Sequence, residues 1–190
     1  MKLIPLPAFQ DNHRWLLHDG QRALVVDPGD AGPVQADLAE PGLQLTAILV
    51  THHHPDHNGG PDARRDAPGA AGFGPARGRI PQPRTRLLAL PGHARVCGTH
   101  EYTRGKLKFA TAVEPGTAKL VHYRQQCGER RSRGEPTLPS TNALENSVNP
   151  FLRSRQPAVA QAARGHDLAA DPADAVAVFA ALRPWKNEFQ

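Results

Sequence analysis

Four apolar runs of strand length, separated by turn residues, fill the first fifty residues of the chain. The second and third runs flank Asp19-Gly20, which favours a hairpin, and prolines break the first run, which places it at a sheet edge. Asp11-Asn12-His13 is typical of a turn, and residues 33–40 favour a short helix. The four predicted strands comprise residues 2–9, 14–17, 23–26 and 45–50.

Regular structure is interrupted after residue 50. Residues 60–65, with a proline in the first turn, indicate the start of a helix. Residues 68–86 are rich in glycine, proline and arginine without a period, and they predict a loop with one short strand near 71–73. Two further short strands are expected at 87–90 and 95–98, on either side of a Pro-Gly turn.

Apolar residues recur at helical spacing from about residue 103. Ser140 or Thr141 can cap a helix that carries Leu144 and Val148, and Asp171-Pro172 is expected to open the last helix. A β-rich first half and a helical second half predict an α+β protein with two lobes and a boundary near residue 103. The residues at helical spacing are Leu107, Ala110 and Val113, then Leu120, Tyr123 and Cys127, and finally Val176, Phe179 and Leu182.

The composition is typical of a globular protein, with 39% hydrophobic and 22% charged residues. The net charge of +5 suits an anionic small substrate, whereas the lack of a basic run with interleaved aromatic residues argues against nucleic acid. Cys97 and Cys127 are too few for a disulfide framework and are expected as reduced thiols. No apolar stretch reaches membrane-spanning length, and prolines interrupt the amino terminus, so we expect a cytoplasmic protein.

A dense group of metal-binding side chains follows the predicted strand at 45–50. His52, His54, Asp56 and His57 follow one another at the spacing His-x-His-x-Asp-His. Imidazole and carboxylate are ligands of zinc, iron and manganese at hydrolytic centres. A surface histidine cluster that chelates metal adventitiously is the alternative, but a preceding strand and following glycines favour a rigid site. Asp27 is a candidate partner of a metal-bound histidine, and capping of the next turn explains it equally well.

Several further motifs occur in order along the second half. They are Thr99-His100-Glu101-Tyr102-Thr103, Leu107-Lys108-Phe109-Ala110, Val113-Glu114-Pro115, residues 136–141, residues 149–153 and Arg183-x-x-Lys186. Together with the histidine stretch, which resembles the signature of the metallo-β-lactamase superfamily, they resemble glyoxalase II (hydroxyacylglutathione hydrolase). The resemblance implies an αββα sandwich followed by a helical carboxyl-terminal lobe. Residues 1–103 would form the β-lactamase-like domain, and residues 104–190 a helical glutathione-binding domain.

The resemblance also implies the site residues. His52 and His54 would bind a first metal, and Asp56, His57 and His100 a second, with Asp56 also the candidate catalytic residue. Substrate contacts would come from the His-Glu-Tyr motif and from a pair in the terminal helix, namely Tyr102, Arg183 and Lys186. Without the resemblance, the terminal pair would be interpreted as a solvated charged helix end.

The chain departs from the family near residues 80–88, where family members carry several more strands. The missing block holds the third histidine of the first metal, an aspartate that bridges both metals, and a substrate-binding loop. The second metal keeps a ligand set typical of mononuclear zinc sites, so we expect about one zinc per chain in place of a binuclear centre, with iron or manganese as alternatives. His93 is expected as a surface turn residue, and a replacement ligand is the alternative.

In the family, a metal-activated water attacks the thioester of S-D-lactoylglutathione and yields glutathione and D-lactate, a step in methylglyoxal detoxification. We therefore expect a hydroxyacylglutathione hydrolase, with the internal shortening as a threat to its activity. The alternative is a catalytically inactive remnant that binds metal or glutathione without turnover. A nuclease or β-lactamase of the same fold is disfavoured by the carboxyl-terminal lobe. The expected partner is a small glutathione thioester, bound by a monomer that associates with neither nucleic acid nor membrane.

Overall fold

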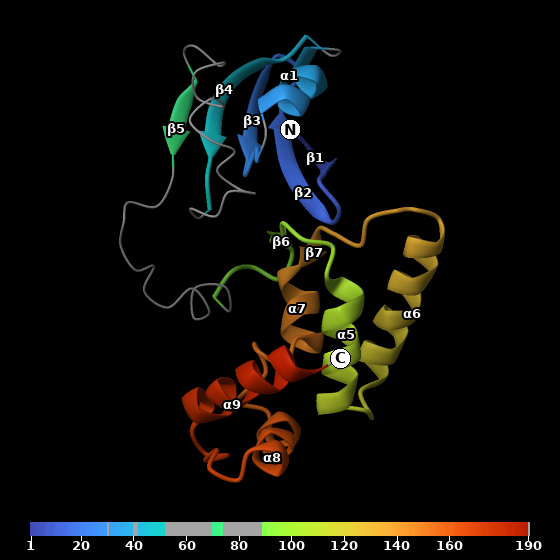
Figure 1. The fold of residues 1–190 in the computed structure, drawn as a ribbon, viewed down its shortest axis with the longest axis vertical. Coiled ribbons are helices and arrows are strands. Elements are labelled where there is room, and N and C mark those ends of the chain that lie inside the picture. The colour runs from blue at the N-terminus through green and yellow to red at the C-terminus, as the bar shows by residue number, and fades with distance from the viewer. Residues whose placement is uncertain (30, 40–41, 52–69, 74–88, 190) are drawn as a thin grey trace. The chain divides into compact units, whose positions relative to one another are not determined.

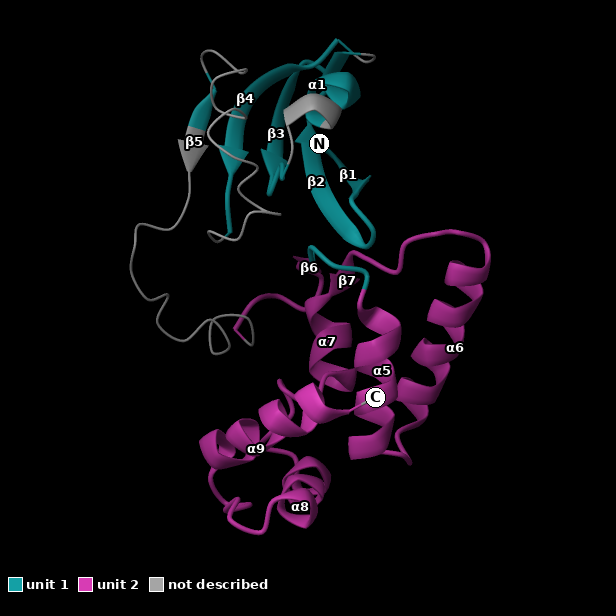
Figure 2. Ribbon diagram, viewed as in Figure 1, with its two compact units in different colours: residues 1–81, 97–101 teal, residues 82–96, 102–190 magenta. Residues whose placement is uncertain are grey.

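The computed structural model describes residues 1–29, 31–39, 42–51, 70–73 and 89–189 (Figure 1). The chain divides into two compact units (Figure 2). Unit 1 contains Met1–Pro81 and Cys97–Glu101, and unit 2 contains Gln82–Val96 and Tyr102–Gln190. No helix in the described part of the chain is long and apolar enough to cross a membrane.

Unit 1 is built on a five-stranded sheet with the order β1-β2-β3-β4-β5. The first three strands form an antiparallel meander, whereas β4 and β5 each add in parallel. The Asp19-Gly20 turn joins β2 to β3, and Gly20 has the positive φ of 106° that this tight turn requires. The strands are β1 (Lys2–Ala8), β2 (Asn12–His18), β3 (Arg22–Val26), β4 (Gln44–Leu49) and β5 (Ala71–Phe73).

One face of this sheet is covered by helix α1 (Ala31–Ala39). Val34 and Leu38 on the helix pack with Leu16 and Val25 of the sheet in one buried apolar cluster. Alternate strand residues point to the same face, and the period of two in β3 places the buried side chains of Ala23 and Val25 in this cluster.

Unit 2 is mainly helical and also contains a two-stranded sheet. Strands β6 (Arg95–Val96) and β7 (Ser140–Thr141) pair in antiparallel fashion. Helix α7 begins directly after β7, where the Thr141 hydroxyl accepts a hydrogen bond from the amide of Leu144. The helices are α5 (Thr103–Val113), α6 (Ala118–Ser132), α7 (Asn142–Val148), α8 (Pro157–His166) and α9 (Ala175–Glu188).

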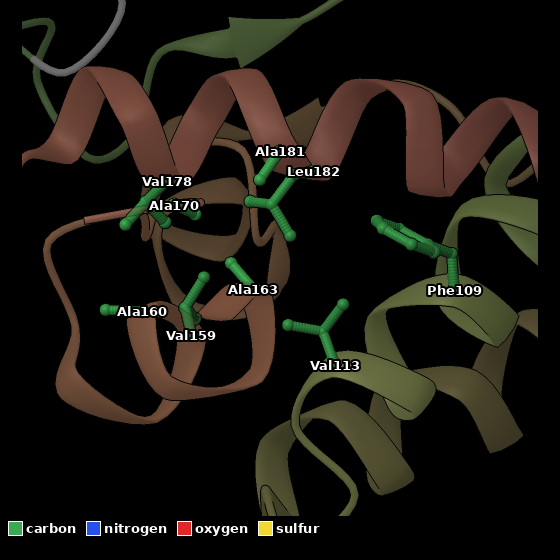
Figure 3. Packing of buried hydrophobic residues seen from close by; sticks show 9 residues of the cluster. All are labelled: Phe109, Val113, Val159, Ala160, Ala163, Ala170, Val178, Ala181 and Leu182. Carbon is green, nitrogen blue, oxygen red and sulfur yellow. The ribbon is translucent and has the colours of Figure 1, made fainter. Parts of the chain in front are cut away.

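The largest buried cluster of unit 2 joins α5, α8 and α9. Side chains from all three helices point toward one another, with Phe109 and Val113 of α5 facing Leu182 of α9 (Figure 3). A second cluster joins α5 to α6 and α7 through Leu107, Leu120 and other apolar residues. Because α5 contributes a different face to each cluster, it is the central helix of this unit.

Most elements predicted from the pattern are present. The hairpin strands, the edge position of β1, the short strand at 71–73 and the cap at Thr141 are confirmed. The α+β class, with a helical second part, is also confirmed. The helix predicted at 33–40 begins two residues earlier, at Ala31. The helix start predicted at 60–65 lies outside the described residues.

Some local predictions are correct only in part. Asn12 and His13 belong to β2 and not to a turn, because they pair with Ala8 and Pro7 of β1. Of the strands expected at 87–90 and 95–98, the described residues 89–90 form a turn, and only Arg95–Val96 pair with another strand.

The last helix begins at Ala175, because Asp174 caps it by accepting from the amide of Val176. Asp171 instead accepts from the amide of Ala173 in the preceding turn. The shifted start places Val176 in solvent, with 71% of its surface exposed, so the prediction that it faces the core is wrong.

Candidate functional site

The predicted metal ligands fall on two segments of unit 1. His52, His54, Asp56 and His57 lie outside the described residues, directly after Thr51, which is described. His100 lies in the short segment Cys97–Glu101, which joins this unit from a distant part of the sequence. The geometry of the site is therefore described through Thr51, His100 and their neighbours.

Asp27 connects these two segments. Its carboxylate accepts hydrogen bonds from the Thr51 amide (2.7 Å), the Thr51 hydroxyl (2.7 Å) and the Thr99 hydroxyl (3.3 Å). Asp27 is only 2% exposed and has a positive φ of 51°, a conformation that Asp tolerates better than most residues. Thr51 and Thr99 directly precede His52 and His100, so one buried carboxylate connects the chain at both groups of predicted ligands.

His100 is oriented by the turn that follows β1. Its Nδ1 atom lies 3.3 Å from Oδ1 of Asp11, and its backbone forms a bridge with Asn12. The amide of Glu101 donates to the carbonyl oxygen of Asp11 at 2.8 Å, which fixes the same two segments to each other. Because the carboxylate occupies the Nδ1 side of the ring, Nε2 is the nitrogen that can face a metal.

A second histidine and carboxylate lie beside this pair. Nε2 of His13 is 4.0 Å from Oε2 of Glu101, and both side chains are more than nine-tenths buried. The indole of Trp15 donates a hydrogen bond to the carbonyl oxygen of Gly98 at 3.1 Å. This bond also joins β2 to the Cys97–Glu101 segment. No local pattern indicates that Asp11 or Glu101 faces a histidine, because each partner lies far away along the chain.

The donor set suits a zinc-type metal, although its full geometry falls outside the described part of the chain. Among the described residues, no group of three histidine, cysteine, aspartate or glutamate side chains could hold an ion. His100 is described, and its ring is held by a carboxylate in the manner common for metal-bound histidines. Histidine nitrogen and aspartate oxygen are the ligands that catalytic zinc takes. His93 is an exposed residue of the turn at Pro91–Ala94, as predicted.

The predicted substrate-binding residues all belong to unit 2. Tyr102 precedes helix α5 and is 50% exposed. Arg183 and Lys186 lie one helical turn apart on α9, where Arg183 is exposed and Lys186 is half-buried. Their charged groups lie over the rings of Phe151 and Phe109, a feature that the sequence did not reveal.

Two families match this chain. Residues 101–189 match the family described as Hydroxyacylglutathione hydrolase C-terminus, and residues 13–79 match the Metallo-beta-lactamase superfamily. A hydroxyacylglutathione hydrolase of Albidiferax ferrireducens is 42% identical over 257 aligned positions, which cover 100% of both chains. Proteins of the same name from Cupriavidus taiwanensis and Pseudomonas fluorescens are 38% and 37% identical, and these alignments also cover 100% of each chain.

The alignments support the internal shortening. The alignment with the Albidiferax relative has 257 positions, whereas this chain has 190 residues, although both chains are covered completely. The relative therefore carries positions that have no counterpart here, and the two family matches leave residues 80–100 between them. The predicted fold, an incomplete metallo-β-lactamase-like domain followed by a helical lobe, is confirmed. This chain belongs to the hydroxyacylglutathione hydrolase family of the metallo-β-lactamase superfamily.

Proposed function

We propose that this chain is a metal-dependent thioester hydrolase that converts S-D-lactoylglutathione to glutathione and D-lactate. The names of its full-length relatives support the reaction class. The observation that carries the proposal is the Asp27 carboxylate, which connects Thr51 to Thr99 and so brings the two ligand-bearing segments into one unit. Such a contact would hold both segments close together, which is needed if the ligands that they carry bind the same ion.

The proposed metal is zinc, at about one ion per chain. The proposed ligands are His52, His54, Asp56, His57 and His100. Asp56, His57 and His100 form the more complete half of the set, because the third histidine and bridging aspartate of the family are missing. Asp11 would hold the His100 ring with Nε2 toward the ion.

A zinc ion bound there would supply a hydroxide at neutral pH and Lewis-acid stabilisation of the developing negative charge. Asp56 is the proposed catalytic residue. Tyr102, Arg183 and Lys186 would hold the glutathione part of the substrate, which makes residues 104–190 the proposed glutathione-binding domain. Glutathione leaves as a thiolate, which needs little help from an acid, so the side chains mainly bind and orient the substrate.

A non-catalytic role is the second candidate. It is favoured by the absence of the family's bridging aspartate and third histidine, which would leave a site that binds metal or glutathione without turnover. The two candidates differ in one measurable property. Only the hydrolase releases free thiol from S-D-lactoylglutathione.

The test is thiol release by the zinc-loaded full chain, compared with a double variant that carries His54→Ala and His57→Ala. We expect release above that of the variant, and no difference would contradict the hydrolase. Zinc content after dialysis against a weak chelator gives an independent measurement. His100→Ala should remove most of the zinc, whereas His53→Ala should remove little, because His53 occupies a non-ligand place in the motif.

A further inference from the structure

Helix α6 presents an exposed stripe that combines two arginines with one apolar residue. Val121, Arg124, Gly128 and Arg131 recur at helical spacing, which places them on one face of the helix. All four are exposed, and a Cβ atom added at Gly128 would meet nothing within 4 Å, so this face is open surface. We call these four residues the basic stripe.

The charges of the basic stripe are available to an external partner. Among the described residues, no carboxylate forms an ion pair with Arg124 or Arg131, although Arg131 donates to the carbonyl oxygen of Glu135. Val121 in the same stripe is 56% exposed. A surface of this kind fits a partner that offers carboxylates beside apolar side chains.

The connection between α8 and α9 presents the opposite charge. Asp167, Asp171 and Asp174 each accept a hydrogen bond through Oδ1 from the amide two residues further on, at 3.0, 2.9 and 2.8 Å. These bonds hold the backbone of the connection, and none of the three carboxylates pairs with a cation in the part of the chain that the structure describes. Leu168 and Val176 are 76% and 71% exposed. We call these five residues the acidic loop.

One chain does not bring the two surfaces together. Both belong to unit 2, where α6 and the α8–α9 connection lie on opposite sides of the helical part (Figure 1). Helix α5 lies between them, because it packs on α6 with one face and on α8 and α9 with another. Arg164, a cation near the acidic loop, donates to the carbonyl oxygen of Ala170 and so supports the loop. A partner for either surface therefore comes from another molecule.

We propose that the basic stripe of one chain binds the acidic loop of a second copy. Arg124 and Arg131 would pair with the aspartates, and Val121 would meet Leu168 or Val176. A guanidinium suits this contact because it can donate two parallel hydrogen bonds to one carboxylate. The inference is independent of the proposed hydrolysis, and it replaces the monomer expected from the sequence by a chain that associates at high concentration.

The geometry of the contact sets the kind of assembly. It joins two different surfaces, so each chain in a pair keeps one free stripe or one free loop. Association then continues head to tail, into a ring or an open chain. Exposed ion pairs contribute little each and are screened by salt, so we expect the association to be weak and to decrease as salt is added.

Helix α6 is less suited to two other polyanions. A helix that lies on a membrane inserts several apolar side chains, but Leu120, Tyr123 and Cys127 of α6 are buried in the core. Proteins that bind single-stranded nucleic acid stack its bases on exposed aromatic rings, and the aromatic residue of α6 is the buried Tyr123. The acidic loop supplies both the carboxylates and the apolar side chains that the stripe can meet.

The test is sedimentation equilibrium of the full chain over a range of concentrations, in low salt and in about 0.5 M NaCl. Arg124→Glu changes the stripe and Asp171→Arg changes the loop. Asp171→Asn removes the charge but keeps an acceptor for the amide of Ala173. Arg155→Glu is the matched control, because Arg155 is exposed, lies outside the stripe and undergoes the same change of charge. Circular dichroism checks that each variant is folded.

The parent chain should associate at about 1 mM in low salt and dissociate in high salt. Arg124→Glu and Asp171→Arg should each weaken association about tenfold, and Asp171→Asn about two- to fivefold, whereas Arg155→Glu should change it little. An equimolar mixture of Arg124→Glu and Asp171→Arg should form one-to-one dimers, because the first keeps an intact loop and the second an intact stripe.

A parent chain that stays monomeric at about 1 mM in low salt would overturn the proposal. Association that salt does not weaken, or an equal loss in Arg155→Glu and Arg124→Glu, would overturn it as well. Variants that associate alone as well as in the mixture would show that the stripe and the loop are not the contact. A monomeric chain that binds anionic vesicles or duplex DNA through Arg124 would assign the stripe to a different partner and reject the second copy.

Discussion

Asp27→Asn tests how unit 1 holds its proposed metal ligands. The substitution keeps the shape of the side chain but removes its charge and turns one acceptor oxygen into a donating amide. Asn tolerates the left-handed backbone conformation at this position, where φ is 51°. The change therefore acts on the hydrogen bonds to Thr51 and Thr99 and not on the backbone.

The size of the effect follows from those hydrogen bonds. The Asn oxygen can still accept from the Thr51 amide, and both threonine hydroxyls can rotate to accept from the new amide. The net loss is then close to one hydrogen bond to a charged group, which lowers the free energy of unfolding by about 1.5–3 kcal/mol. The segments that carry the proposed ligands would then be held less firmly, so the zinc affinity should fall about tenfold. This is the lower end of the loss that is usual when a residue supporting a metal ligand is mutated.

The two quantities are measured by urea unfolding and by zinc competition with a chelator. Asp19→Asn is the control, because Asp19 also accepts two backbone amides, those of Gln21 and Arg22, at the opposite end of β3. Its variant should keep the zinc affinity of the parent chain. Equal zinc affinities in the parent chain and Asp27→Asn, or equal losses in the two variants, would refute the reasoning.

Three further predictions concern stability and reactivity. Arg153→Lys should lower the free energy of unfolding by about 1.5–3 kcal/mol, because lysine cannot reproduce the paired hydrogen bonds to Glu114; an unchanged denaturant midpoint would contradict this. Backbone amides of Arg22 and Gln21 lower the pKa of Asp19 from 3.8 to about 2. The stability advantage of the parent chain over Asp19→Asn should thus be complete above about pH 5 and disappear as the pH falls toward about 2, whereas a pH-independent difference in unfolding experiments would argue against this role. A thiol reagent should label the exposed Cys97 rapidly in the folded protein and the buried Cys127 only after unfolding, and rapid labelling of both would show that the α6 core is open.

The sheet and several helices were predictable because their signals are local. Asp19-Gly20 indicates a tight turn, and the apolar runs on either side of it locate the two strands of the hairpin. Ser140 and Thr141 are adjacent candidate caps, and Thr141 is the one that accepts from the amide of Leu144, so the start of α7 could be located to within one residue. Each of these signals lies within a few residues of the element that it predicts.

Helix α8 and the start of α9 carried weaker signals. The buried face of α8 is formed by Val159, Ala160 and Ala163, and alanine contributes little to an apolar pattern even when a neighbouring helix buries it. Before α9, Asp171 and Asp174 are both suitable caps. Both accept a backbone amide, so the sequence could not decide which one begins the helix.

The contacts that hold the proposed site could not be predicted from local sequence patterns. Asp27 is 72 residues from Thr99, and Asp11 is 89 residues from His100, so only the fold brings each carboxylate to its partner. Both carboxylates come from the first thirty residues, whereas the internal shortening lies after residue 79. Loss of that block would remove the ligands that the family resemblance places in it, but it leaves intact the contacts that hold Thr51, Thr99 and His100. This is the physical reason to expect a shortened chain that still binds one metal, in place of one that binds none.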